Sequence, residues 1–112
     1  MSIALRLDPR GPTAPAAKHN RTVACYLARD YQAAESITCQ SIREYPDLPR
    51  AYVWRAAVLG QLGHHDAPAA LEKAISVAPR YIRYKTDERS PYMREEDHEH
   101  FLDGLRKAGW QS

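Results

Sequence analysis

The sequence predicts an all-α fold. Apolar residues recur at the three- and four-residue spacing of a helix in several segments. Most of these segments end at a proline or a glycine, which are residues that stop helices. Strand signals are weak, because valine, isoleucine and threonine are scattered and no Asn-Gly hairpin dipeptide occurs. The turns between the segments are very short, so neighbouring helices must pair in antiparallel orientation.

The composition indicates one globular domain, residues 1–112, because 44% of the residues are hydrophobic and 27% are charged. The 16 basic and 14 acidic side chains are interspersed, which argues against a dedicated nucleic-acid surface. No apolar run approaches the roughly 18 residues of a membrane span, and prolines interrupt the opening stretch MSIALRLDPRGP, where a signal peptide would stay apolar. We therefore expect a cytoplasmic protein. Cys25 and Cys39 are expected as buried thiols, with a disulfide between them as the alternative.

The first pair of helices is expected over residues 13–46. Residues 13–29 form the first helix, with Tyr26 on its apolar side. The second helix covers residues 30–45 and has a clear apolar face. It stops there because Pro46 forces the residue before it out of the helical conformation.

The second pair is expected over residues 47–79. Its first helix, 49–62, carries apolar residues on nearly all sides and ends at Gly63, which suits a left-handed C-cap. Its second helix, 66–77, begins with Asp66 as N-cap and has a one-sided apolar stripe. The residues of this stripe are Ala67, Ala70, Leu71, Ala74 and Ile75.

The end of the chain is expected to hold a strap and a capping helix. Residues 80–93 form the strap, either an irregular segment or a short frayed helix. Residues 94–109 form the capping helix, which has acidic residues at its start and Arg106 and Lys107 at its end, as the helix macrodipole favours. Gly109 supplies its C-cap. The apolar face consists of Phe101, Leu102, Leu105 and Ala108.

The two helix pairs repeat. Pro46 and Pro79 each close a second helix and lie 33 residues apart, and tetratricopeptide repeats have a period of about 34 residues. Repeat two, 47–79, matches the family's pattern of large and small residues at Tyr52, Ala56, Leu59, Gly63, Ala67, Leu71 and Ala74. Repeat one, 13–46, is a degenerate match. The chain therefore resembles the tetratricopeptide repeat (TPR) family, which implies a right-handed stack of about two antiparallel helix pairs.

The terminal stretch PYMREEDHEHFLDGLRKAGW carries a second resemblance. It is similar to the segment that closes the TPR-rich C-terminal part of many bacterial class III adenylate/guanylate cyclase-type proteins. The matching residues include Pro91, Tyr92 and the run from Gly104 to Gly109. No cyclase catalytic domain is present, so the resemblance implies a non-catalytic, protein-binding appendage.

In such a stack the helix over 49–62 lies in the middle, which explains why it is apolar nearly all round. The resemblance also implies a concave groove that binds a protein or peptide. The groove residues would be His19, Val23, Tyr26, Arg50, Val53, Trp54, Ala57 and Gln61. Trp54 is of a type common at binding hot spots, and the alternative is that it belongs to the core, covered by the terminal helix. Val23 and Trp54 occupy positions where the carboxylate-clamp type of TPR domain carries Lys and Asn, which disfavours an acidic C-terminal peptide as partner.

The sequence offers little for metal binding or catalysis. His64, His65 and Asp66 are consecutive, but we expect them to be solvated surface residues and not metal ligands. His98 and His100 are two residues apart on a helix and point to different sides, which is poor geometry for a chelate. There is no Gly-rich phosphate loop and no nucleophile elbow. We expect no metal, no cofactor and no enzymatic activity.

The function expected is a protein-interaction or scaffold module. Its partner would bind the concave groove or the uncapped N-terminal end, and a homodimer that buries this end is one possibility. One alternative is a regulatory tail of a cyclase-like signalling system. Another is a nucleic-acid-binding accessory, because the tyrosines of the strap alternate with Arg and Lys. We expect these tyrosine rings to be buried where the strap lies across the last helix pair, and not to stack on nucleic-acid bases.

Overall fold

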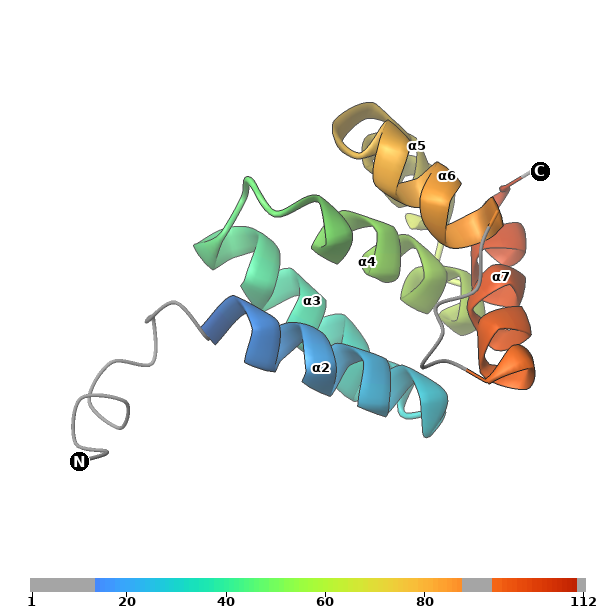
Figure 1. The fold of residues 1–112 in the computed structure, drawn as a ribbon, viewed down its shortest axis with the longest axis horizontal. Coiled ribbons are helices and arrows are strands. Elements are labelled where there is room, and N and C mark those ends of the chain that lie inside the picture. The colour runs from blue at the N-terminus through green and yellow to red at the C-terminus, as the bar shows by residue number, and fades with distance from the viewer. Residues whose placement is uncertain (1–13, 88–93, 111–112) are drawn as a thin grey trace.

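The computed structural model describes residues 14–87 and 94–110. Within these ranges the chain forms six helices and no strand, which confirms the all-α fold class (Figure 1). The helices are α2 (Ala14–Leu27), α3 (Tyr31–Glu44), α4 (Pro49–Leu62), α5 (Ala67–Val77), α6 (Pro79–Asp87) and α7 (Glu95–Ala108). In this part of the chain, no helix is both long enough and apolar enough to cross a membrane.

The helix ends lie close to where the sequence predicts them. Gly63 and Gly109 both adopt the left-handed conformation after α4 and α7, with φ of 63° and 117°. The side chain of Asp30 accepts a hydrogen bond from the Ala33 amide at 3.3 Å and so caps the start of α3. Asp66 precedes α5 as predicted, but its side chain makes no capping hydrogen bond. Its carboxylate lies beside a histidine instead, at 3.4 Å from His65 Nε2.

The remaining predictions for single elements have mixed outcomes. The stripe on α5 is buried at Ala67, Leu71 and Ala74, but Ile75 was wrongly included because it is 40% exposed. The first part of the strap, 80–87, lies in the short helix α6. The rest of the strap, including Pro91 and Tyr92, lies outside the described residues. Cys25 and Cys39 are free, partly buried thiols.

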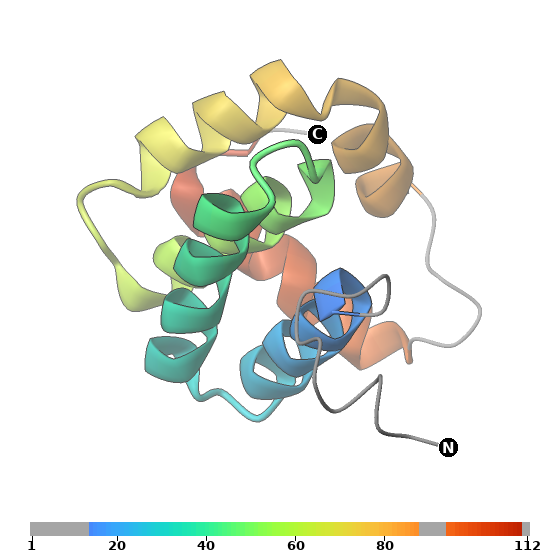
Figure 2. The same ribbon diagram turned by 90° about the vertical axis from the view of Figure 1, so that its left-hand side faces the viewer.

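Helix α4 is the centre of the molecule. It packs against α3, α5 and α7, and its edges reach α2 and α6. Figure 2 shows α4 enclosed between α5 and the α2–α3 pair. Eight of its residues are buried, namely Ala51, Val53, Trp54, Ala56, Ala57, Val58, Leu59 and Gly60. Because helices contact α4 on several sides, the sequence of this one helix has to be apolar nearly all round.

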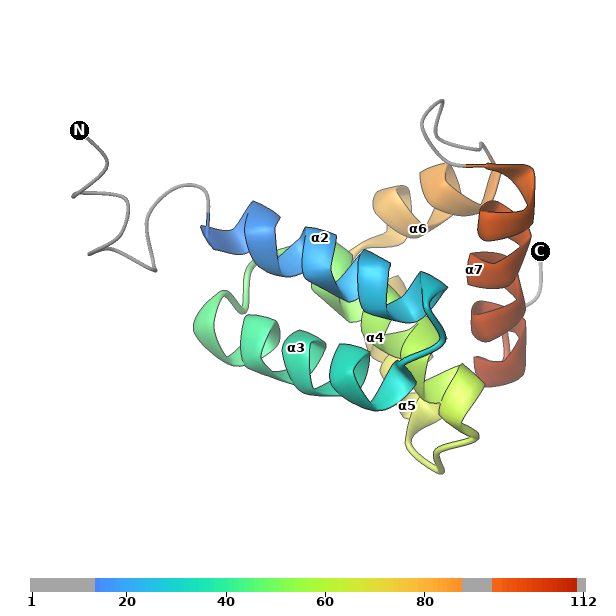
Figure 3. The ribbon, with the colours of Figure 1, turned by 90° about the horizontal axis from the view of Figure 1, so that it is seen from below.

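The C-terminal helix α7 crosses α4 instead of running alongside it. Figures 1 and 3 show α7 lying across the ends of α2 and α4. Two glycines meet at this crossing: a Cβ atom on Gly60 would collide with the carbonyl oxygen of Gly104, and one on Gly104 would lie 2.6 Å from the carbonyl oxygen of Ala57. Neither helix tolerates a side chain here, so the backbones touch directly.

This crossing gives a structural reason for the small residues in the run from Gly104 to Gly109. Gly104 is the contact with α4, and Ala108 is buried beside it with 1% of its surface exposed. Leu105 is fully buried, whereas Arg106 and Lys107 face solvent. Gly109 ends the helix with a positive φ. The run is therefore what a small-residue helix crossing followed by a glycine C-cap requires.

Candidate interaction site

The eight residues expected to line a groove lie on α2 and α4, and the structure divides them into two groups. Four are buried: Tyr26, Val53, Trp54 and Ala57. Four are partly exposed: His19, Val23, Arg50 and Gln61. In the first group, Trp54, Tyr26 and Ala57 contact α7. Half of the eight expected residues therefore belong to the core, and the binding of a partner by this set stays a prediction.

Trp54 lies in the core and packs against α7. Its side chain is 1% exposed, and its ring lies 4.5 Å from that of Phe101 on α7 and 5.4 Å edge-on from that of Tyr26 on α2. Its indole N–H donates to the Tyr81 hydroxyl at 3.3 Å. Phe101 needs apolar surface to cover it, and the indole supplies that surface. The alternative prediction, that Trp54 is a core residue covered by the terminal helix, is confirmed.

Tyr26 and Gln61 form a polar link to α7. The Tyr26 hydroxyl donates to the carbonyl oxygen of His100 at 2.5 Å. The Gln61 side-chain amide donates to the Tyr26 hydroxyl at 3.2 Å and to Asp103 Oδ2 at 3.2 Å. Lys107 donates to Gln61 Oε1 at 3.0 Å and pairs with Asp103 at 3.1 Å. Tyr26 and Gln61, which were expected in the groove, therefore help to hold α7 in place. A buried hydroxyl such as that of Tyr26 needs a hydrogen-bond partner, and α7 supplies it.

The electrostatics of this link follow from its burial. Loss of solvent raises the pKa of Tyr26, so its hydroxyl stays protonated and able to donate. The hydrogen bond from Lys107 lowers the pKa of Asp103. The His100 ring lies 4.5 Å from the Tyr26 ring and shares a hydrogen bond of 2.6 Å with the Tyr31 hydroxyl. Burial, followed by the charge of Arg29, lowers the pKa of His100.

A second polar group lies around Arg50 at the start of α4, and its members are His19, Arg50 and Lys85. We call these three residues the basic rim. His19 contacts Trp54 edge-on, with ring centroids 6.0 Å apart. His19 and Arg50 also line a cavity of about 10 Å³, which is room for about one water molecule. Burial, followed by the positive charges of Arg50 and Lys85, lowers the pKa of His19 to about 4.

Arg50 and Lys85, the two cations of the basic rim, have no counter-charge among the residues that the structure describes. Neither Arg50 nor Lys85 makes a side-chain hydrogen bond or an ion pair with any residue that the structure describes, although both side chains are partly buried. Other basic residues nearby are paired, such as Lys18 with Glu44 at 3.4 Å. Burial lowers the pKa of Lys85. The rim thus concentrates positive charge at a partly desolvated place. Sequence reasoning missed Lys85, because it stood in the strap and not on a predicted groove helix.

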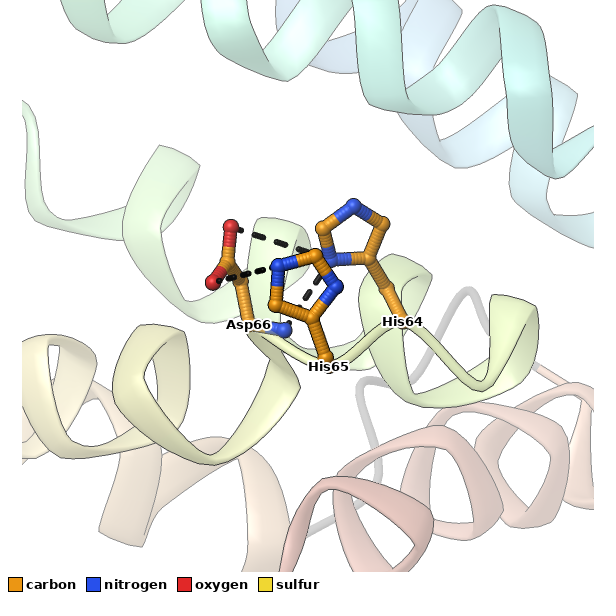
Figure 4. A group of neighbouring side chains, drawn as sticks. All are labelled: His64, His65 and Asp66. Atoms are coloured by element: carbon orange, nitrogen blue, oxygen red, sulfur yellow. Dashed lines mark hydrogen bonds and ion pairs between the residues drawn. The ribbon is translucent and has the colours of Figure 1, made fainter.

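The histidines outside the rim fall into two classes. His64 and His65 lie with Asp66 in the α4–α5 turn, where the three side chains gather on the surface (Figure 4). His98 and His100 each have a partner of another kind. His98 Nε2 lies 2.8 Å from the carbonyl oxygen of Lys85, and His100 contacts Tyr31 as described above. The second pair therefore serves packing between helices.

The lowered pKa values of His19 and His100 predict that acid destabilises the fold. The unfolded chain binds protons to these imidazoles near pH 6.5, whereas folded His19 does so only near pH 4. The free energy of unfolding should therefore fall as the pH drops from about 6.5 to about 4, by about 2 kcal/mol for His19 after allowance for its partial exposure. Urea unfolding across this range measures the change. The His19→Gln variant, compared with wild type, removes this part of the pH dependence, and an unchanged slope would contradict the assignment.

No family model, curated protein or solved structure matches the chain in comparisons of these three kinds.

Proposed function

We propose that this protein is a non-catalytic protein-interaction module built as a TPR-like stack of two helix pairs. The spacing of residues in repeat two supports this proposal, and so does the packing order. Helix α2 contacts α3, α3 contacts α4, and α4 contacts α5, so each of the first three helices packs on the next one along the chain. Such nearest-neighbour packing is typical of repeat proteins. Helix α7 then closes the stack by crossing α4.

The partner binds at the basic rim through an acidic side chain. The observation that carries this proposal is the presence of two partly buried cations, Arg50 and Lys85, without a counter-charge among the described residues. A carboxylate from a partner would supply a counter-charge and offset the loss of solvent at these two cations. The neutral His19 beside them can donate or accept a further hydrogen bond.

A protein partner is favoured over a nucleic acid. The chain carries 16 basic and 14 acidic residues, and only two permanent cations belong to the rim. A nucleic-acid surface usually combines a longer basic stripe with aromatic rings that are free to stack on bases. Trp54, the ring that His19 contacts, is buried against Phe101 of α7. An internal acidic segment therefore fits better than a phosphate backbone.

Reversal of the rim's charge tests this function. The Arg50→Glu/Lys85→Glu double variant should bind acidic peptides from a synthetic array at least about tenfold more weakly than wild type, because attraction becomes repulsion. The matched control is Arg80→Glu/Arg83→Glu, which makes the same charge change at exposed positions of α6. The control should bind as wild type does.

Two further measurements keep this test decisive. Thermal unfolding should show that the rim variant is about as stable as the control, since neither Arg50 nor Lys85 loses an ion pair with a described residue. Peptide binding that is equal in the rim variant and in wild type would refute the proposal. Tight binding of a random oligonucleotide that weakens steeply with salt would favour the nucleic-acid alternative instead.

A further inference from the structure

The α4–α5 turn gathers two imidazoles and one carboxylate on the surface. Gly63 ends α4 in the left-handed conformation and α5 begins at Ala67, so His64, His65 and Asp66 form the link between them. His65 Nε2 lies 3.4 Å from Asp66 Oδ1, and His64 Nδ1 lies 3.8 Å from Asp66 Oδ2. One ligand atom from each of the three residues lies within 4.8 Å of the others (Figure 4).

These separations are close to those of ligands on one zinc ion. Zinc binds histidine nitrogen and carboxylate oxygen at about 2.0–2.1 Å in tetrahedral geometry, which places neighbouring ligands about 3.3 Å apart. The His65–Asp66 pair already has this separation, and the His64–Asp66 pair exceeds it by about half an ångström. The three ligand atoms spread over up to 4.8 Å, and all three side chains are exposed, so they are free to change rotamer and converge on one ion.

We propose that this turn is a zinc-binding site formed by His64, His65 and Asp66, with water in the remaining coordination position. Two imidazoles and one carboxylate form the type of ligand set that zinc accepts in open sites. Magnesium and calcium are disfavoured because they prefer oxygen ligands. Copper and nickel also bind imidazole, so selectivity for zinc over them is not part of the proposal.

The same turn indicates that the site binds zinc weakly and reversibly. His64 Nδ1 accepts a hydrogen bond from the Asp66 backbone amide at 3.0 Å, and a metal at this atom has to replace that bond. The two rings also stack nearly parallel, with centroids 4.5 Å apart, so at least one ring has to turn before both nitrogens can face the same ion. The fold forms without the ion, because the turn connects two helices that pack through their own apolar faces.

Zinc chloride titrated into the full-length chain tests this inference in chelator-free buffer near neutral pH. The imidazole proton signals of His64 and His65 should shift saturably in NMR spectra. The signals of His98 and His100 should not shift, because those rings already face Lys85 and Tyr31. His65→Gln should weaken zinc binding at least about tenfold, through loss of one of three ligands. His98→Gln, the matched control, should bind zinc as wild type does.

Three outcomes would overturn the inference. The first is no saturable shift of the His64 and His65 signals at millimolar zinc. The second is an equal affinity for His65→Gln and wild type. The third is binding that is lost in a Cys25→Ala/Cys39→Ala variant, which would assign the zinc to thiols. Circular dichroism confirms that each variant is folded, and the exposure of His64 and His65 makes this the expected result.

Discussion

Gly104→Ala should lower the free energy of unfolding by about 3 kcal/mol, although alanine is the better helix former. The added Cβ atom would lie 2.6 Å from the carbonyl oxygen of Ala57 and would also collide with the Tyr26 hydroxyl. A backbone carbonyl cannot rotate away as a side chain can, so α7 has to move away from α4. An exposed helical glycine would instead gain up to about 1 kcal/mol on substitution by alanine. The sign of the effect is therefore diagnostic of the crossing.

Urea unfolding followed by tryptophan fluorescence measures this loss, because Trp54 lies against Phe101 of α7. Gly60→Ala should be similarly destabilising, since its Cβ would meet Gly104 from the opposite side. The double variant should cost less than the sum of the two, because separating the helices once makes room for both methyl groups.

Gly63→Ala is the comparison with a different mechanism. A Cβ on Gly63 would meet no atom within 4 Å, so its only cost is the left-handed backbone at φ of 63°. This strain amounts to about 1–2 kcal/mol. A loss for Gly104→Ala no larger than that for Gly63→Ala would contradict the close crossing.

The helices were predictable from the sequence because their signals are local. Pro46, Gly63 and Gly109 stop helices through their own backbone preferences, without help from distant residues. The centrality of α4 was also predictable, because a helix that is apolar nearly all round needs neighbours on several sides. The right-handed TPR stack and the interaction function remain predictions.

The candidate site was less predictable because it depends on contacts between distant segments. Whether Trp54 faces a partner or α7 is decided by Phe101, which lies 47 residues later in the chain. The sequence was compatible with both arrangements. The role of Gly104 could not be predicted from the run Gly104 to Gly109 alone, since its contact with Gly60 is a tertiary one. Periodicity describes one helix at a time and cannot report how two helices cross.

Trp54→Ala should lower the free energy of unfolding by about 3–5 kcal/mol, which is the usual cost of deleting a buried tryptophan side chain. The variant would lose the ring contacts with Tyr26, Phe101 and His19, and it would leave the Tyr81 hydroxyl without its indole donor. Chemical unfolding followed by circular dichroism measures the loss. Trp54→Phe keeps an apolar ring in the core and should cost less. A loss below about 1 kcal/mol for Trp54→Ala would show that the side chain is not in the core.

This expectation changes how partner binding has to be tested. A domain of this size has a total stability of roughly 5–15 kcal/mol, so Trp54→Ala removes much of it. Loss of binding in that variant would report unfolding and not a contact with the partner. The rim variant Arg50→Glu/Lys85→Glu changes only partly exposed side chains, which have no ion pair with a described residue to lose. Binding that fails in the rim variant at unchanged stability, and that Trp54→Phe retains, would place the partner at the rim and not against the indole.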